Sequence, residues 1–269
     1  MNRCAATWAF RPNAETLKLY KNLGNGSFRD VTSEVGLDKV IMPMGSNFAD
    51  IDNDGYLDMY LGTGNPGYAS LLLNVTLHSK EGKFFVDVTA SSGTGELHKG
   101  HGVAFADIDN DGDEDLLTEI GGAVPGDRHA FRLFENPGNG NDWISLHLVG
   151  EKSNRSAIGA RIKVTVQDGT QAPRSICRTV GSSGSFGASP LQQHVGLGKD
   201  ARIQEIEIWW PTSNTRQHFK DVAKNQFLEI KEFASSYPKL ERHPYRLGGK
   251  NRDTTSAATA VVAPATGMK

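Results

Sequence analysis

Short runs of alternating apolar and polar residues dominate the second half of the chain. In ARIKVTV, residues 160–166, the apolar side chains Ile162, Val164 and Val166 share one face, and charged or polar side chains take the other. A period of two is typical of a half-buried antiparallel strand. The same alternation predicts four further strands, at WISLHLV (143–149), LQQHVGL (191–197), QEIEIWW (204–210) and NQFLEIK (225–231). These strands predict a small antiparallel β-sandwich over residues 141–232.

The first half is organised by an internal repeat. The eight residues FADIDNDG at 48–55 return unchanged at 105–112, 57 positions later. A phrase that ends in Asp-Val-Thr keeps the same offset, from 26–32 to 83–89. A strand-like phrase completes the unit, at 17–26, 70–76 and 131–140. Units of about four short strands are typical of β-propeller blades, so an all-β fold with a partial propeller over residues 15–140 is predicted.

Each long copy of the repeat contains an acidic loop of the pattern D-x-D-x-D-G-x-x-D. Carboxylates at every second position of a tight loop converge on one point, as hard cations that bind oxygen require. Glycine at the sixth position permits a positive φ, and the carbonyl at the seventh position completes the predicted cage. The predicted ligands are Asp50, Asp52, Asp54, Tyr56 and Asp58 in the first acidic loop (residues 50–58), and Asp107, Asp109, Asp111, Asp113 and Asp115 in the second (residues 107–115). Ca²⁺ is the expected ion, about two per chain, because it accepts many oxygens in tolerant geometry.

An EF-hand and a solvated acidic turn are the alternatives to such a site. An EF-hand needs a glutamate at loop position 12 and helices on both sides. Position 12 is Leu61 in one loop and Thr118 in the other, and both flanks alternate like strands. A solvated turn without a cation would leave several carboxylates in mutual repulsion. Metal binding therefore explains both loops best.

The two loops in their strand context resemble the calcium-binding FG-GAP (VCBS-type) repeats of integrin-like β-propellers. Further along, the phrases at 148–164, 189–198 and 205–211 resemble the ASPIC/UnbV domain, which typically follows FG-GAP repeats. The combination is similar to the secreted cartilage acidic protein 1 family and its bacterial relatives. This resemblance implies FG-GAP-type blades, bound calcium and an extracellular or periplasmic location, and it implies little about mechanism.

Composition narrows the class of protein further. The 269 residues carry a net charge of −2, from 29 basic and 31 acidic residues. The basic residues are scattered, which argues against a nucleic-acid-binding protein. No apolar run reaches the roughly 20 residues of a membrane-spanning helix, and no signal peptide is recognisable after Met1. The two cysteines, Cys4 and Cys177, leave both a disulfide and two free thiols open.

The turn-rich stretch 136–142 marks the predicted boundary between repeats and C-terminal domain. Residues 1–14 precede the repeats, and residues 233–269 lack periodicity and are predicted to form a disordered tail. Two and a half units cannot close a propeller, which needs at least four blades. We therefore expect that 1–269 is a fragment lacking further blades, or that its open edge self-associates or is covered by another chain.

Catalytic groups do not converge in the sequence, which contains neither a nucleophile elbow nor a Cys-x-x-Cys motif. The favoured function is a non-enzymatic, calcium-binding, extracytoplasmic binding or adhesion module with a protein or glycan partner. The alternative is an enzyme or enzyme accessory protein acting on a small molecule, in keeping with the biosynthetic gene neighbourhoods of some bacterial relatives. A pocket that groups His101, Arg155 and a carboxylate would favour this alternative.

Overall fold

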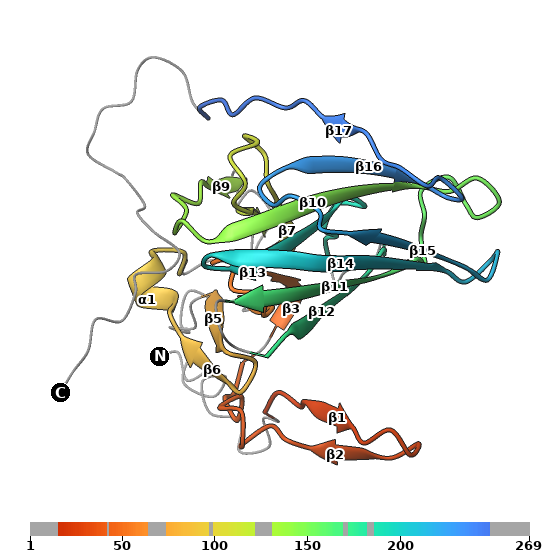
Figure 1. Cartoon of the computed structure of the whole chain (residues 1–269). Coiled ribbons are helices and arrows are strands. Elements are labelled where there is room, and N and C mark those ends of the chain that lie inside the picture. Colours follow the sequence, from red (N-terminus) through yellow and green to blue (C-terminus); the bar gives the residue numbers. More distant parts are fainter. Residues whose placement is uncertain are drawn as a thin grey trace, which may run out of the picture.

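The chain is mostly β in the computed structural model. The structure describes residues 16–41, 43–63, 74–96, 99–121, 131–168, 172–181 and 186–247. Within these ranges the chain forms strands β1–β17 and the short helix α1 (Thr89–Ser92) (Figure 1). In the described part, no helix has the length and apolar character needed to span a membrane. Cys177 is an exposed free thiol, and Cys4 lies outside the described residues.

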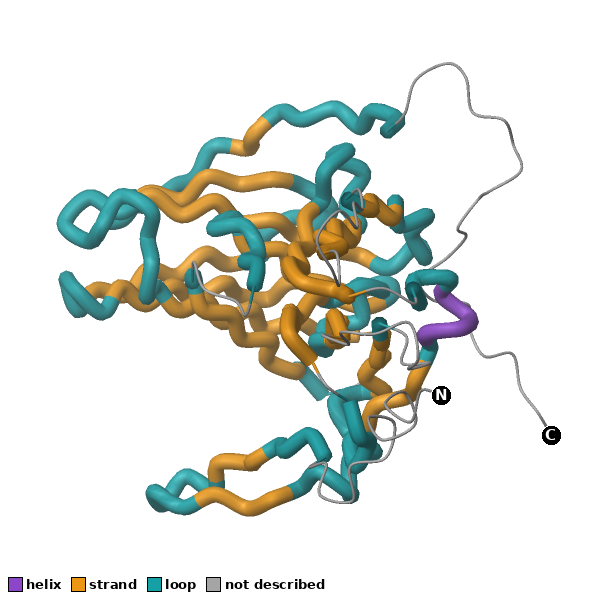
Figure 2. Tube along the Cα trace, turned by 180° about the vertical axis from the view of Figure 1, so that it is seen from behind, coloured by secondary structure: helices purple, strands orange, loops and turns teal. Residues whose placement is uncertain are grey.

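The described residues of the first half form three small antiparallel sheets, with the orders β1-β2, β3-β4-β5-β6 and β7-β8-β9. The strands are β1 (Tyr20–Asn22), β2 (Phe28–Asp30), β3 (Pro43–Ala49), β4 (Asp58–Thr63), β5 (Val75–Lys80), β6 (Phe84–Asp87), β7 (Lys99–Ala106), β8 (Asp115–Gly121) and β9 (Arg132–Phe134). Strands β7, β8 and β9 repeat β3, β4 and β5 at the 57-residue offset, so the sequence repeat is a repeat of sheet structure. The β1-β2 hairpin projects from the rest of the chain, as Figure 2 shows from behind.

The two larger sheets of the first half pack against each other where β7 meets β3 and β4. One buried cluster joins them, made of Ala49, Ile51, Tyr60, Val103, Phe105 and Leu116. A second cluster, of Leu37, Ile41, Met59, Leu61 and Leu77, belongs to the first of these sheets and its leading loop. Because the acidic loops leave the ends of β3 and β7, this packing brings the two loops together.

Two four-stranded sheets make up the C-terminal domain, with the orders β13-β10-β16-β17 and β12-β11-β14-β15. The strands are β10 (Asp142–Val149), β11 (Arg161–Asp168), β12 (Arg174–Thr179), β13 (Gln193–Gly198), β14 (Ala201–Trp210), β15 (Thr215–Lys220), β16 (Phe227–Lys231) and β17 (Lys239–Leu240). Strands β10 and β16 run parallel, with Leu146 opposite Leu228. This corrects the prediction of a wholly antiparallel domain: the chain between them crosses through the other sheet, and such a crossover allows parallel entry.

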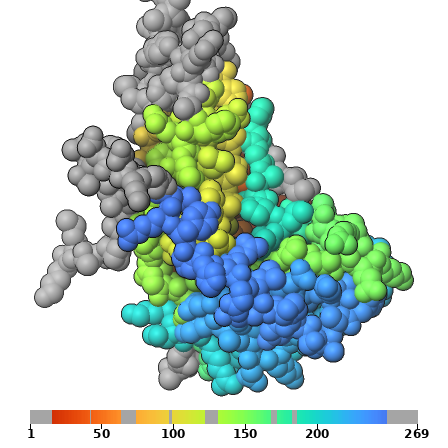
Figure 3. Space-filling model, turned by 90° about the horizontal axis from the view of Figure 1, so that it is seen from above, coloured from red at the N-terminus to blue at the C-terminus, as the bar shows by residue number. Residues whose placement is uncertain are grey.

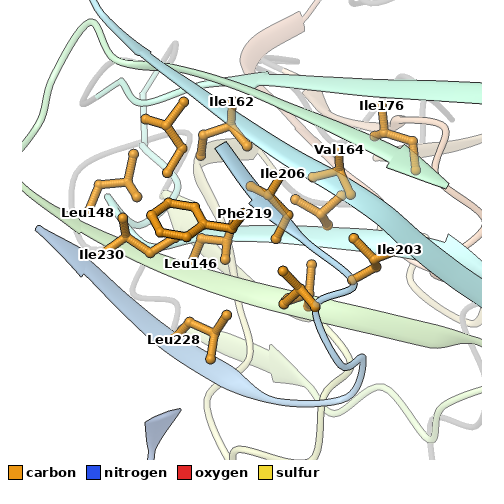
Figure 4. Close-up of a cluster of buried hydrophobic side chains, with 14 of the residues drawn as sticks. Leu146, Leu148, Ile162, Val164, Ile176, Ile203, Ile206, Phe219, Leu228 and Ile230 are labelled. Carbon is orange, nitrogen blue, oxygen red and sulfur yellow. The ribbon is translucent and has the colours of Figure 1, made fainter. Parts of the chain in front are cut away.

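The two sheets of the C-terminal domain face each other across one hydrophobic core. Figure 4 shows Leu146, Leu148, Leu228 and Ile230 from one sheet gathered with Ile162, Val164, Ile176, Ile203, Ile206 and Phe219 from the other. Trp210, at the end of β14, is also fully buried in this core. The core draws its residues from within the C-terminal domain, so the surface that contacts the acidic loops is supported by the domain's own core.

The segment after residue 233 differs from the predicted tail over its described part, residues 234–247. Strand β17 pairs with β16, and the guanidinium of Arg242 lies 5.0 Å from the ring centroid of Phe227. The N–H of Tyr245 donates to the carbonyl of Asp109 at 2.9 Å. These contacts fasten the segment across both halves of the molecule, where Figure 3 shows it in blue beside yellow and green atoms of the repeats. The rest of the predicted tail lies outside the described residues.

Candidate metal centre

Both acidic loops connect antiparallel strands, β3 to β4 and β7 to β8. The same pattern of hydrogen bonds occurs within each loop. In the first loop, the N–H of Gly55 donates to Asp50 Oδ2 at 2.9 Å. In the second, the N–H of Gly112 donates to Asp107 Oδ2 at 3.1 Å. Strands on both sides exclude an EF-hand, as the sequence predicts.

The aspartate at the ninth position of each loop, Asp58 or Asp115, accepts two further hydrogen bonds from the backbone. Asp58 accepts the N–H of Ile51 on Oδ2 at 2.9 Å and the N–H of Ser79 on Oδ1 at 2.7 Å. Asp115 makes the two equivalent contacts, at 3.0 and 2.8 Å. Each of these buried carboxylates therefore ties its loop to the neighbouring strand, a bracing role that the ligand pattern alone does not reveal.

The backbone conformation of the loops explains their asparagines and glycines. Asn53 and Asn110 have φ values of 55° and 60°, a left-handed region that asparagine tolerates better than most residues. Gly55 and Gly112 have φ values of 93° and 97°. A Cβ at Gly112 would also lie 2.0 Å from the indole nitrogen of Trp143, so this position requires glycine for space as well as for conformation.

Three carboxylates converge in each loop. Ligand atoms of Asp50, Asp52 and Asp54 lie within 4.8 Å of one another, and so do those of the second-loop group, Asp107, Asp109 and Asp111. In the first loop, Asp50 Oδ1 and Asp52 Oδ1 are buried and have no hydrogen-bond partner. Because an unpaired buried carboxylate oxygen is costly, these atoms fit a cation as their missing partner.

Burial raises the pKa of most carboxyl groups in the loops, and the neighbouring carboxylates raise it further. The pKa is raised to about 7 for Asp107 and Asp113, to about 6 for Asp52 and Asp115, and well above the ordinary value for Asp50. In the folded chain, the ionised form of these carboxyl groups is therefore disfavoured unless a positive charge lies nearby. A bound divalent cation would supply the counter-charge.

Four predicted ligands have side chains outside these two clusters: Asp58 and Asp115, which brace the loops, and Tyr56 and Asp113. The Tyr56 ring lies 5.2 Å from the guanidinium carbon of Arg174. Asp113 accepts a hydrogen bond from the side-chain amide of Asn53 at 2.9 Å. The predicted role of Tyr56 and Asp113 depends on the backbone carbonyl alone, and that part of the ligand set remains a prediction.

The ligand pattern omits His78, which lies in β5 next to the first loop. His78 Nδ1 is 2.9 Å from Asp58 Oδ1, and Nε2 is 3.5 Å from Asp52 Oδ2. Together the three residues form a third candidate metal group. Burial lowers the pKa of His78, but the Asp58 hydrogen bond and the charges of Asp58 and Asp52 outweigh it, so the pKa is raised overall.

The first loop is also the contact point with the C-terminal domain. His194 Nε2 lies 2.7 Å from Asn53 Oδ1, and the N–H of Gly198 donates to the Asn53 carbonyl at 2.8 Å. From the edge strand β12, Arg178 forms an ion pair with Asp50 at 3.3 Å. The candidate cation site therefore lies at the joint between the two halves.

The two loops contact each other at the same joint. The side-chain amide of Asn53 donates to the Gly112 carbonyl at 2.9 Å, and that of Asn136 donates to the Ile51 carbonyl at 2.8 Å. Glu114 accepts the N–H of Asp50 at 3.3 Å. Both loops and the C-terminal domain thus meet in one hydrogen-bonded network.

Comparison with known families agrees with this architecture. Residues 6–61 match the FG-GAP-like repeat, and residues 150–236 match the ASPIC and UnbV family. The chain therefore contains an FG-GAP-like repeat and, C-terminal to it, an ASPIC/UnbV domain. The FG-GAP match contains the first acidic loop, and the second loop follows it at the 57-residue offset. No curated protein matches the chain.

Proposed function

We propose that this protein is a calcium-binding module whose two acidic loops each hold one Ca²⁺ and thereby fix the repeats against the ASPIC/UnbV domain. The observation that carries the proposal is the pair of unpartnered buried oxygens, Asp50 Oδ1 and Asp52 Oδ1, in a loop that is duplicated with its hydrogen bonds. Clustered carboxylate oxygens are the donors that Ca²⁺ prefers. The finer architecture belongs to the same proposal: the sheets β3-β4-β5-β6 and β7-β8-β9 are blades of a partial β-propeller.

The position of the loops supports a structural role for the ion. Asp50 is paired with Arg178, and Asn53 is held by His194 and Gly198, so the first loop cannot rearrange without disturbing the C-terminal domain. An ion that neutralises the loop carboxylates stabilises the folded joint because the unfolded chain binds it weakly. Calcium binding and domain contact are coupled for this reason.

An extracytoplasmic location and a protein or glycan partner are further parts of the proposal. Extracellular calcium modules bind in the range of about 10⁻⁴ to 10⁻³ M, which suits structural sites outside cells. On the outer face of β14, Trp209 lies between the guanidinium groups of Arg161 and Arg216, 4.8 and 5.1 Å from its ring centroid. These residues line a cavity of about 290 Å³, and tryptophan and arginine often anchor interfaces. In the repeats, Phe131 is 67% exposed, which favours self-association or a covering chain.

The alternative function, an enzyme or enzyme accessory protein, has less support. Arg155 lines a cavity of about 280 Å³ together with His147 and Glu229. His101 is absent from that lining; its ring packs against Phe186, with 6.2 Å between the ring centroids. The pocket that would favour this alternative is therefore not formed by the described residues.

Isothermal titration of metal-stripped protein with Ca²⁺ tests the proposal. We expect two sites per chain, and we expect Asp54→Ala and Asp111→Ala each to remove one site while leaving the other. Asp200→Ala, on the exposed turn between β13 and β14, is the matched control and retains both sites. Absence of Ca²⁺ binding to the stripped wild-type chain at millimolar concentration would overturn the proposal.

A further inference from the structure

We propose that the two loops differ in cation preference, because His78 gives the first loop an imidazole ligand that favours a first-row transition cation of the Mn²⁺ class. This inference rests on the proposed function, in which both loops bind divalent cations. It adds a nitrogen ligand that the aspartate pattern does not contain.

The surroundings of His78 resemble those of a metal-binding histidine. The residue is 2% exposed, and Asp58, its partner, is 0% exposed. A carboxylate only accepts hydrogen bonds, so Asp58 Oδ1 at 2.9 Å requires a proton on His78 Nδ1. Histidine ligands of metals typically donate one ring N–H to a carboxylate and direct the other nitrogen at the metal. In this chain Asp58 is the orienting carboxylate and Nε2 is the free ligand atom.

The other ring nitrogen of His78, Nε2, faces the carboxylate of Asp52. His78 Nε2 lies 3.5 Å from Asp52 Oδ2, longer than a normal N–H···O hydrogen bond. Asp52 Oδ1 is buried without a partner, and so is Oδ1 of Asp50, a residue that is 1% exposed. A divalent cation bound here would displace any proton from Nε2 and would bind the nitrogen together with the aspartate oxygens that face it. Asp52 belongs to both candidate groups of this loop and connects the imidazole to the other aspartates.

The second loop lacks this imidazole. The 57-residue offset places Glu135 where the first unit has His78. The three groups that converge in the second loop are carboxylates, whose oxygens suit the hard cation Ca²⁺. Imidazole nitrogen is a ligand for first-row transition cations, whereas Ca²⁺ binds oxygen ligands. Mn²⁺ accepts the carboxylates of both loops, so the imidazole is the feature that would raise its affinity for the first loop. One residue in the repeat thus separates a calcium loop from a loop that also accepts Mn²⁺ well.

Single-site variants make this difference measurable. Asp111→Ala leaves the first loop to be titrated, and Asp52→Ala, which removes the residue shared by both candidate groups of the first loop, leaves the second. Competition of Mn²⁺ against Ca²⁺ in each variant gives the preference of each loop. We expect the first loop to favour Mn²⁺ over Ca²⁺ at least about 10-fold more than the second loop does, the scale on which metal-site residues affect affinity.

Pulsed electron paramagnetic resonance of bound Mn²⁺ identifies the ligand directly. In Asp111→Ala we expect ¹⁴N coupling from imidazole, and we expect His78→Gln in the same background to abolish the coupling and the extra Mn²⁺ preference. If that variant fails to fold, the reverse exchange tests the same role: Glu135→His in the Asp52→Ala background is expected to gain the ¹⁴N coupling and the extra Mn²⁺ preference.

The outcomes separate this inference from the proposed function. Ca²⁺ binding at both loops with equal Mn²⁺ preference, or Mn²⁺ without ¹⁴N coupling in Asp111→Ala, overturns the role of His78 and leaves the calcium module intact. Failure of the wild-type chain to bind either ion overturns both proposals.

Discussion

Glu232 lies directly after β16 and is 1% exposed, yet donors of this chain satisfy its carboxylate. The backbone N–H groups of Glu151, Lys152 and Ser153 donate to Glu232 Oε2 at 2.8, 2.8 and 2.7 Å. The hydroxyl of Ser153 donates to Oε1 at 2.8 Å. Asp50 is equally buried and retains an oxygen without a partner. The fold itself therefore satisfies the buried carboxylate of Glu232, whereas Asp50 Oδ1 lacks a protein partner and is open to a cation.

Replacing Glu232 by Gln is expected to lower the free energy of unfolding by about 3 kcal/mol at pH 7, since the variant loses charge-assisted hydrogen bonds. Burial would raise the pKa of Glu232, but hydrogen bonds from Ser213, Ser153 and Glu151 outweigh it and lower the pKa to about 2. The unfolded chain binds this proton at a higher pH than the folded chain. The stabilisation is therefore complete above the unfolded-state pKa and is lost as the pH falls toward 2.

Urea unfolding of the wild type and of Glu232→Gln at pH 7 and pH 3 measures this effect. The difference between the two proteins should shrink at the lower pH. Glu151→Gln is the matched control, because it keeps the backbone N–H that binds Glu232. Equal stability of Glu232→Gln and wild type at pH 7 would contradict the assignment.

At the scale of elements, the segment 234–247 offers a clear test. Removing it deletes β17 and the Tyr245 hydrogen bond to Asp109, so we expect a chain ending at residue 233 to be less stable than one ending at residue 247 by about 2 kcal/mol or more. Thermal unfolding of the two truncated chains measures the difference. Identical midpoints would show that the segment behaves as the predicted tail.

Strand prediction succeeds where side chains alternate, as in the edge strand β13, and fails at the two polar edge strands of the other sheet. The predicted strand 204–210 lies within β14, and 143–149 lies within β10. Strands β12 and β15 were not predicted, because their sequences RSICRT and TRQHFK are mostly polar. These are edge strands of their sheet, where one side of the backbone lacks a neighbour and polar residues are favoured.

The residues of the candidate site also fall into those that the sequence predicts and those that it does not. The aspartates of each loop are close in sequence, so their spacing alone predicts that they converge. His78 lies in the strand VTLHSK, 26 positions after Asp52, and only the pairing of β4 with β5 brings it beside the loop. Contacts across the joint, such as Arg178 with Asp50, link residues 128 positions apart and have no local signal. Local ligand sets are therefore predictable, and long-range ones require the fold.

At the scale of the whole molecule, the contact between the acidic loops and the C-terminal domain joins three parts. These are the two larger sheets of the repeats and the C-terminal domain itself. The hydrogen bonds of Asn53 illustrate this, because its side chain contacts Gly112 in the second loop and His194 in the C-terminal domain. Asn141, in the boundary stretch, also donates to the Asp52 carbonyl at 2.8 Å. A cation that rigidifies the first loop would consequently act on the stability of all three parts.

The dependence of unfolding on Ca²⁺ tests this coupling most directly. Ca²⁺ at 100 times its Kd should stabilise the folded chain by about 2.7 kcal/mol per site, because the unfolded chain binds it weakly. We therefore expect the thermal midpoint of the wild type to rise with Ca²⁺ and to fall with a chelator. The midpoint of the double variant Asp54→Ala and Asp111→Ala should respond to neither. A wild-type midpoint that is the same in Ca²⁺ and in chelator would contradict the calcium-dependent joint.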